Sequence, residues 1–173
     1  MTDEGHLWIW GDNEFGRLGL GHADRIEENY YPNRVGETTD VWTDFSHSGS
    51  NLYGVKNNKL YAAGQNDNYN IGLGLLNTET QLSMIEVPGV DMTEVNSWQS
   101  SFAGFISIKN NGELWGFGGN WKGQLAIDPN EQRQNTMNTI DVNDDGLGGI
   151  NNVDNISEEN TLRVQGVYET GQF

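Results

Sequence analysis

One acidic run in the sequence has the residue types and spacing of a metal-binding loop. Residues 141–146 read Asp-Val-Asn-Asp-Asp-Gly, so side-chain oxygens fall on Asp141, Asn143 and Asp145, and a glycine takes the sixth position. Calcium prefers carboxylate and carbonyl oxygens, and loops of this pattern supply them from alternate residues, with the glycine at a sharp turn. The sequence therefore predicts calcium as a cofactor bound by Asp141, Asn143 and Asp145.

The residues after this run indicate how such a loop would close. Residues 149–154 resemble the second half of a dockerin-type calcium loop, and this resemblance implies Asp154 as the closing carboxylate. The alternative is a solvated polar loop without a metal ion, which lengthens the third of the three repeats described below. The sequence leaves both interpretations open.

The remaining polar residues show no pattern of a catalytic site. Three histidines occur at scattered positions, His6, His22 and His47, whereas acid–base catalysis needs such groups to converge. The chain has no cysteine, which excludes disulfide bonds, thiolate-bound zinc and thiol nucleophiles. We therefore expect a protein without enzymatic activity.

Charge limits the kinds of partner. The 173 residues include 9 Lys and Arg against 25 Asp and Glu, a formal net charge of −16. Phosphate-rich ligands need clustered cations, so we expect neither nucleic acid nor anionic membranes as partners. We expect protein partners instead, either further copies of this chain or other subunits of an assembly.

The sequence also bears on localisation. The first residues, Met1-Thr2-Asp3-Glu4, are acidic, and no apolar run of 18 residues occurs, so we expect no signal peptide and no membrane span. The compartment stays unknown at this level. A virion or an extracellular assembly is a setting that the cysteine-free, Asn-rich composition fits.

These residues sit in a chain built from repeats. Three segments align at spacings of 53 and 54 residues, each with a leucine, an aromatic residue, a glycine and an asparagine at matching positions. The matching sets are Leu7, Leu60 and Leu114; Trp8, Tyr61 and Trp115; Gly11, Gly64 and Gly118; Asn13, Asn66 and Asn120. We expect one repeat domain over 1–173, with repeats at approximately 2–57, 58–111 and 112–173 and a longer loop at 128–160.

Each repeat predicts short strands joined by tight turns. Asn57-Asn58 and its counterpart before Leu114 lie between apolar runs, which is typical of a β-hairpin, because asparagine and glycine tolerate positive φ. We expect the shared glycines to end strands, the shared asparagines to hold the next turn, and an apolar residue to plug it. The plugs would be Leu18, Ile71 and Leu125, and the shared aromatic residues would pack between neighbouring sheets.

The repeats resemble those of the regulator of chromosome condensation family. The run from Trp10 to Gly19, the later run Pro32-Asn-Arg-Val35 and the run from Gly118 to Leu125 carry the likeness. The second repeat departs from the family pattern, because Tyr69 replaces a glycine. The resemblance implies an all-β fold of β-propeller blades. Three repeats make a three-blade arc, a partial propeller that needs completion by another chain or region.

Two functions follow from these observations. The first is a structural or adhesive protein–protein interaction module in a larger assembly, such as a phage virion (tail, fibre or capsid-associated) or a cell surface. The second is a signalling propeller, since the resemblance implies action on a small GTPase. In both interpretations Phe15 and Trp121, at loop tips, are candidate anchors for a partner, and packing in the core is the equal alternative for both.

Overall fold

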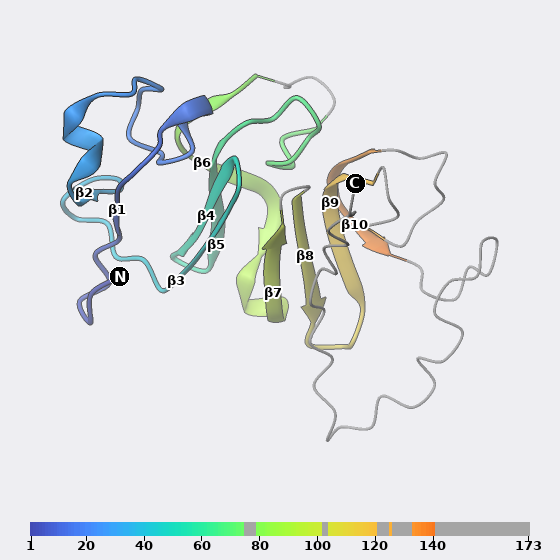
Figure 1. Ribbon diagram of the computed structural model, residues 1–173. Coiled ribbons are helices and arrows are strands. Elements are labelled where there is room, and N and C mark those ends of the chain that lie inside the picture. Colours follow the sequence, from blue (N-terminus) through green and yellow to red (C-terminus); the bar gives the residue numbers. More distant parts are fainter. Residues whose placement is uncertain (75–78, 102–103, 121–124, 126–132, 141–173) are drawn as a thin grey trace, which may run out of the picture.

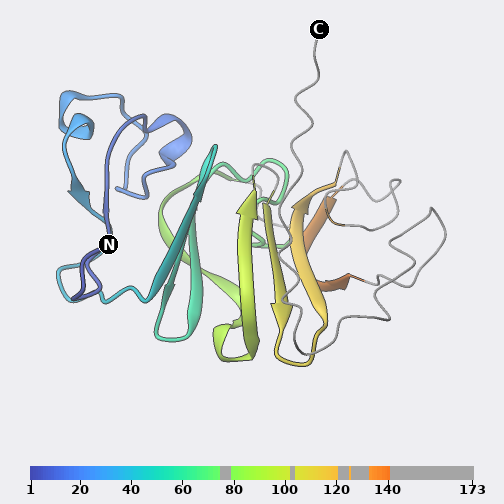
Figure 2. The same cartoon turned by 60° about the horizontal axis from the view of Figure 1, so that its bottom comes forward.

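The chain folds into three antiparallel β-sheets and contains no α-helix among the residues described. The computed structural model describes residues 1–74, 79–101, 104–120, 125 and 133–140. Figure 1 shows the sheets side by side in chain order, from the blue N-terminal part to the orange β10, and Figure 2 shows the same order from another side.

The first sheet has two strands and the other two have four. The first pairs β1 (Trp8–Ile9) with β2 (Asn33–Arg34). The second has the order β3 (Asp44–Ser48), β4 (Asn51–Lys56), β5 (Lys59–Gly64) and β6 (Gln81–Asp91). The third repeats this order with β7 (Val95–Ser101), β8 (Gly104–Lys109), β9 (Leu114–Gly119) and β10 (Arg133–Ile140). Four antiparallel strands in sequence order are the blade of a β-propeller.

Short 3-10 turns connect these strands. They are η1 (Glu14–Gly16), η2 (Glu27–Tyr30) and η3 (Met92–Glu94). At η3 the carboxylate of Asp91 accepts hydrogen bonds from the amide and the hydroxyl of Thr93, at 2.9 and 2.7 Å. Strand β7 starts immediately after this turn, so η3 marks the passage from the second sheet to the third.

The predicted hairpins are confirmed. Strands β4 and β5 pair from Asn51 opposite Gly64 to Lys56 opposite Lys59, and Asn57 and Asn58 between them have φ values of 52° and 60°. Positive φ at both central residues is the type I′ geometry that suits the twist of a two-residue hairpin. The asparagine pair therefore fixes the register of the second sheet.

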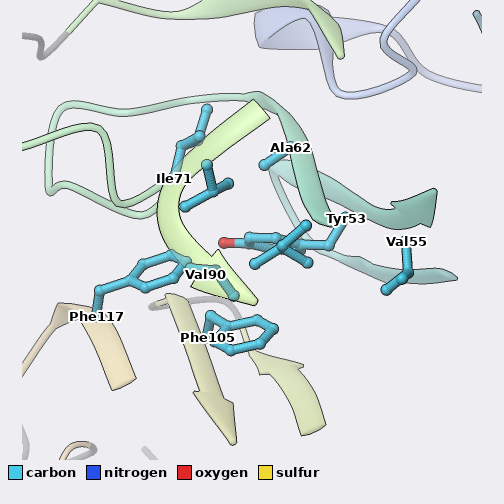
Figure 3. Packing of buried hydrophobic residues seen from close by; sticks show 9 residues of the cluster. Tyr53, Val55, Ala62, Ile71, Val90, Phe105 and Phe117 are labelled. Atoms are coloured by element: carbon cyan, nitrogen blue, oxygen red, sulfur yellow. The ribbon is translucent and has the colours of Figure 1, made fainter. Parts of the chain in front are cut away.

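Two clusters of buried side chains hold the sheets together. One joins the first and second sheets through Leu7, Val35, Trp42 and Leu52. The larger one lies between the second and third sheets, where Tyr53 from β4 faces Phe105 from β8 and Phe117 from β9 (Figure 3). The rings of Phe105 and Phe117 are stacked with centroids 5.1 Å apart. This layer of aromatic side chains is the core of the junction between the two complete blades.

The inner edges of the two blades also touch. Strands β3 and β7 occupy the same edge of their sheets, and the hydroxyls of Ser46 and Ser100 lie 2.5 Å apart. The indole of Trp98 donates a hydrogen bond of 2.8 Å to the carboxylate of Asp44. Both contacts link positions 54 residues apart, which is one repeat of the sequence.

Candidate protein-interaction site

The loop after β1 is built around a buried asparagine. Asn13 is fully buried, and its Oδ1 accepts a hydrogen bond of 3.1 Å from the amide of Leu18. Its Nδ2 donates one of 2.8 Å to the carbonyl of His22. Gly11, at the entrance to this turn, has a φ of 109°, which favours glycine. One side chain thus holds both halves of the loop in place.

The other two repeats contain the same turn. Asn66 Oδ1 accepts from the amide of Ile71 at 3.0 Å, and Asn120 Oδ1 accepts from the amide of Leu125 at 2.9 Å. All three asparagines are fully buried, and Leu18, Ile71 and Leu125 are buried as predicted. The roles that the sequence predicted for the shared glycines, asparagines and plugs are confirmed.

Four charged residues form a network over the first of these loops. Arg17 lies 3.4 Å from the Asp12 carboxylate and 3.5 Å from that of Glu14. Arg25 lies 3.1 Å from Asp12 and 2.7 Å from Glu14. Two carboxylates are therefore shared by two guanidinium groups. Exposed ion pairs are weak one by one, but a network of this kind orders the loop that carries it.

Large apolar side chains project from the same loop region, which we call the aromatic loop (residues 12–31). Phe15 is 40% exposed, Tyr30 is 72% exposed and Tyr31 is 70% exposed. Phe15 has a φ of 60°, and the Arg17 guanidinium lies 6.0 Å from its ring centre. Aromatic residues and arginine dominate the binding energy of protein interfaces. Of the two candidate anchors, Phe15 is exposed, and Trp121 lies outside the described residues.

A hollow opens between the first and second sheets, lined by residues of β1 and β3. Its volume is about 460 Å³. Its walls are largely apolar, and Asp12, Arg17 and His47 also line it. We call this hollow the β1 groove; its apolar walls include Leu7, Trp8, Ile9, Trp10 and Phe45.

The prediction that Trp8 packs between sheets is wrong. Trp8 is 41% exposed, whereas Tyr61 at the matching position packs edge-on against Trp42 with ring centres 5.7 Å apart. The difference arises because Tyr61 belongs to a four-stranded sheet and Trp8 to a two-stranded one. The sequence did not indicate the groove, because its walls come from β1 and β3, which lie far apart in the chain.

The histidines have separate surroundings. His6 lies 3.5 Å from Glu4, and His22 contacts Asn13 and lies 3.8 Å from Asp24. His47 lies in β3 at the β1 groove, where the desolvating walls and the charge of Arg17 lower the pKa of its imidazole below 6.5. Each histidine thus has its own set of neighbours, as the spacing in the sequence suggested.

The predicted calcium ligands Asp141, Asn143, Asp145 and Asp154 lie outside the described residues, so calcium binding stays a prediction. Among the residues that the structure describes, no group of three or more His, Asp or Glu side chains is placed to hold a metal ion. The described part of the chain also has no helix long and apolar enough to span a membrane.

Known proteins share these repeats. The model of the regulator of chromosome condensation (RCC1) repeat matches residues 4–49. The RCC2 homolog of Danio rerio is 31% identical over 128 residues, which are 73% of this chain and 25% of that protein. The X-linked retinitis pigmentosa GTPase regulator of Canis lupus familiaris is 25% identical over 130 residues, 74% of this chain and 13% of that protein. This chain thus spans a quarter or less of the length of these relatives.

Solved structures show the same fold. Yeast RCC1, in a crystal structure with Kap60, superposes with a TM-score of 0.67 at 16% identity, over 80% of this chain and 34% of that one. Human WBSCR16 superposes with a TM-score of 0.62 at 16% identity, over 80% of this chain and 35% of that one. The sheets described above therefore correspond to about a third of such a propeller, and the chain carries RCC1-type repeats and folds as a partial β-propeller.

Proposed function

We propose that this chain is a non-enzymatic protein-binding segment of an RCC1-type propeller and that the aromatic loop contacts the partner. The observation that carries the proposal is the exposure of Phe15, Tyr30 and Tyr31 on a loop ordered by Asn13 and by the ion-pair network. A rigid loop loses little conformational freedom when it binds, so its aromatic side chains retain more of their contact energy.

The partner that we favour is a small GTPase. One relative is named a GTPase regulator, and it matches 74% of this chain. The relatives named above include no virion protein, so they support the signalling interpretation better than the virion or adhesive one.

Charge suggests which face of the partner docks. The chain has a formal net charge of −16, so a partner surface rich in Lys and Arg would be attracted before contact. Near the aromatic loop, Arg17 and Arg25 are already paired with Asp12 and Glu14. We therefore expect long-range attraction to the acidic chain as a whole, and short-range binding through the aromatic side chains.

The test is direct binding to a panel of purified small GTPases, each in nucleotide-free, GDP-bound and GTP-bound form. The full chain should bind at least one of them, and Phe15→Ala combined with Tyr31→Ala should raise its Kd at least tenfold. Ile85→Ala is the matched control, because Ile85 is about as exposed as Phe15 but lies on β6.

A nucleotide-release assay on the same panel separates exchange activity from simple binding. Faster release in the presence of the chain would support a regulatory role. Absence of binding to every GTPase would contradict the proposed partner, and equal weakening by Ile85→Ala would contradict the proposed surface.

A further inference from the structure

Two aromatic residues of the chain hold a backbone conformation that suits glycine. Among the described residues other than glycine, positive φ values occur at Phe15, Asn57, Asn58 and Tyr69. Asparagine is one of the residue types that tolerate this conformation, and the two asparagines form the turn of the β4–β5 hairpin. Phe15 and Tyr69 both have a φ of 60°, where a bulky side chain crowds the backbone. Residue type therefore explains the two asparagines but not the two aromatic residues.

Tyr69 replaces a glycine in a turn that the repeats share. Its counterparts in the first and third repeats are Gly16 and Gly123. The amide of Gly16 donates a hydrogen bond of 3.0 Å to the carbonyl of Asn13, and the amide of Tyr69 donates one of 3.1 Å to the carbonyl of Asn66. The carbonyls of Gly16 and Tyr69 each accept a hydrogen bond of 2.9 Å from the amide three residues later. The same turn thus imposes positive φ at this position in both repeats, and tyrosine is the strained residue there.

The loop that carries Tyr69, which we call the second loop (residues 65–72), is ordered by its own side chains. The carboxylate of Asp67 accepts hydrogen bonds of 3.0 Å from the side-chain amides of Gln65 and Asn68. Asn66 is fully buried beneath them, whereas Asp67 is exposed and Tyr69 is partly exposed. Backbone strain that persists in an ordered loop is typical of a binding site, because the surrounding structure holds the strained residue ready for its ligand.

The second loop lies at the same end of the sheets as η1 of the aromatic loop. It follows β5 as η1 follows β1, and Figure 1 shows both segments at the upper end of the sheets. The start of β6 lies beside both loops. The amide of Gly21 donates a hydrogen bond of 2.8 Å to the carbonyl of Leu82, and the neighbouring Gln81 pairs with Gly64, where the second loop begins. One partner can therefore contact both loops.

We propose that Tyr69 is a second contact for the small GTPase proposed above, beside the aromatic loop, so this inference rests on the proposed function. Phe15 and Tyr69 then bind the same partner from neighbouring repeats. Tyrosine is among the residues that contribute most to interface energy, and this contribution offsets the backbone strain. The exposed carboxylate of Asp67 suits the Lys- and Arg-rich partner surface that the net charge of the chain favours.

The experiment separates the ring of Tyr69 from the strain of its backbone. Tyr69→Gly removes the ring and relieves the strain, whereas Tyr69→Ala removes the ring and keeps the strain. Both variants should raise the Kd for the bound GTPase at least about tenfold, as expected for an interface tyrosine. Tyr69→Gly should melt no lower than the wild type, and Tyr69→Ala should melt below Tyr69→Gly. Titration calorimetry gives the Kd, and thermal unfolding followed by circular dichroism gives the melting temperature.

Asn57→Gly is the matched control. It places a glycine at another exposed residue of positive φ, but in the hairpin that precedes β5, at the opposite end of this strand from the second loop. Its Kd for the GTPase should equal that of the wild type. An effect as large as that of Tyr69→Gly would contradict the proposal, because it would not belong to the second loop.

The outcomes distinguish this inference from the proposed function. A wild type that binds no GTPase of the panel would overturn both. Binding that Phe15→Ala with Tyr31→Ala weakens, and that Tyr69→Gly leaves unchanged, would support the proposed function and refute the role of Tyr69. Melting of Tyr69→Gly several degrees below the wild type would also refute it, because the ring would then serve the packing of the fold. A Tyr69→Ala variant as stable as Tyr69→Gly would remove the strain on which the inference depends.

Discussion

At the scale of single residues, three buried asparagine side chains accept hydrogen bonds from backbone amides, a role that backbone carbonyls usually have. Each of Asn13, Asn66 and Asn120 uses its Oδ1 to satisfy an amide five residues later. A buried amide without a partner is costly, so the side chain is what allows a tight turn to be buried. This explains why a polar residue lies in the core at the same place in every repeat.

Replacing Asn66 tests this role. Asn66→Ala leaves the amide of Ile71 buried without its partner, and we expect the free energy of unfolding to fall by about 2 kcal/mol. Asn68→Ala, two positions later, should change it by less than about 0.5 kcal/mol. Urea denaturation followed by circular dichroism measures both. Equal effects would mean that Asn66 contributes no more than a surface residue of the turn.

The predicted calcium loop is also a matter of single residues. Titration calorimetry with calcium should give heat with the wild type and little heat with Asp141→Ala, which removes the first ligand of the loop. Asp144→Asn is the control, because Asp144 lies in the same acidic run but outside the predicted ligand set. Equal heats from the wild type and Asp141→Ala would dismiss the site in favour of a solvated loop.

At the scale of elements, one ion pair connects the segment between the first two sheets to β4. Lys56 Nζ lies 2.7 Å from the Asp40 carboxylate, and it also lies 5.0 Å and 4.6 Å from the ring centres of Trp42 and Tyr61. Burial opposes ionisation of Asp40. Hydrogen bonds from Lys56 and the Glu37 amide, and the charges of Lys56 and Arg34, outweigh burial and lower the pKa of Asp40 below 3.8.

The sign of this shift gives a pH prediction. The unfolded chain binds the proton more readily than the folded one, so the stabilisation is fully present above pH 3.8 and is lost as pH falls through the folded pKa. Asp40→Asn should lower the free energy of unfolding at pH 7 by about 1 to 2 kcal/mol. It should also lose less stability than the wild type between about pH 4 and pH 2.

The control for this pair is an exposed carboxylate. Asp3→Asn should leave both the stability at pH 7 and its acid dependence close to those of the wild type, because Asp3 is exposed near the N-terminus. Thermal unfolding at a series of pH values measures all three proteins. Parallel pH profiles for the wild type and Asp40→Asn would show that the pair does not stabilise the fold.

At the scale of the whole molecule, the two complete blades share a buried core. Tyr53 and Val87 from the second sheet, and Phe105 and Phe117 from the third, belong to the same buried cluster (Figure 3). In a repeat protein, the interface between neighbours contributes much of the stability of each unit. The described blades should therefore gain and lose their structure together.

Phe105→Ala tests this coupling. Removing a fully buried ring should lower the free energy of unfolding by about 3 kcal/mol. Amide hydrogen exchange should show reduced protection in β5 as well as in β9, although Phe105 belongs to β8. Ile106→Ala, the next residue along and less buried, is the control and should have a smaller effect. Unchanged protection in β5 would show that the blades unfold independently.

The sequence predicted those features that each repeat determines within itself. The glycine, asparagine and plug of each turn and the Asn57-Asn58 hairpin needed only neighbours along the chain, and all are confirmed. The exposure of Trp8 and Trp10 could not be predicted, because it depends on which strand lies beside β1 in space. The Asp40–Lys56 pair was missed for the same reason, since the two residues belong to different elements and no local pattern joins them.

The serine contact between β3 and β7 also bears on how such chains can change in length. A hydroxyl both donates and accepts, so Ser46 and Ser100 match each other without requiring two different residues. A tandem duplication of one repeat would place another serine at the same spacing, ready to contact the serine before it and the one after it. At this inner edge, evolution or protein engineering can therefore add one repeat at a time, because each new repeat brings a serine that forms the same kind of hydrogen bond.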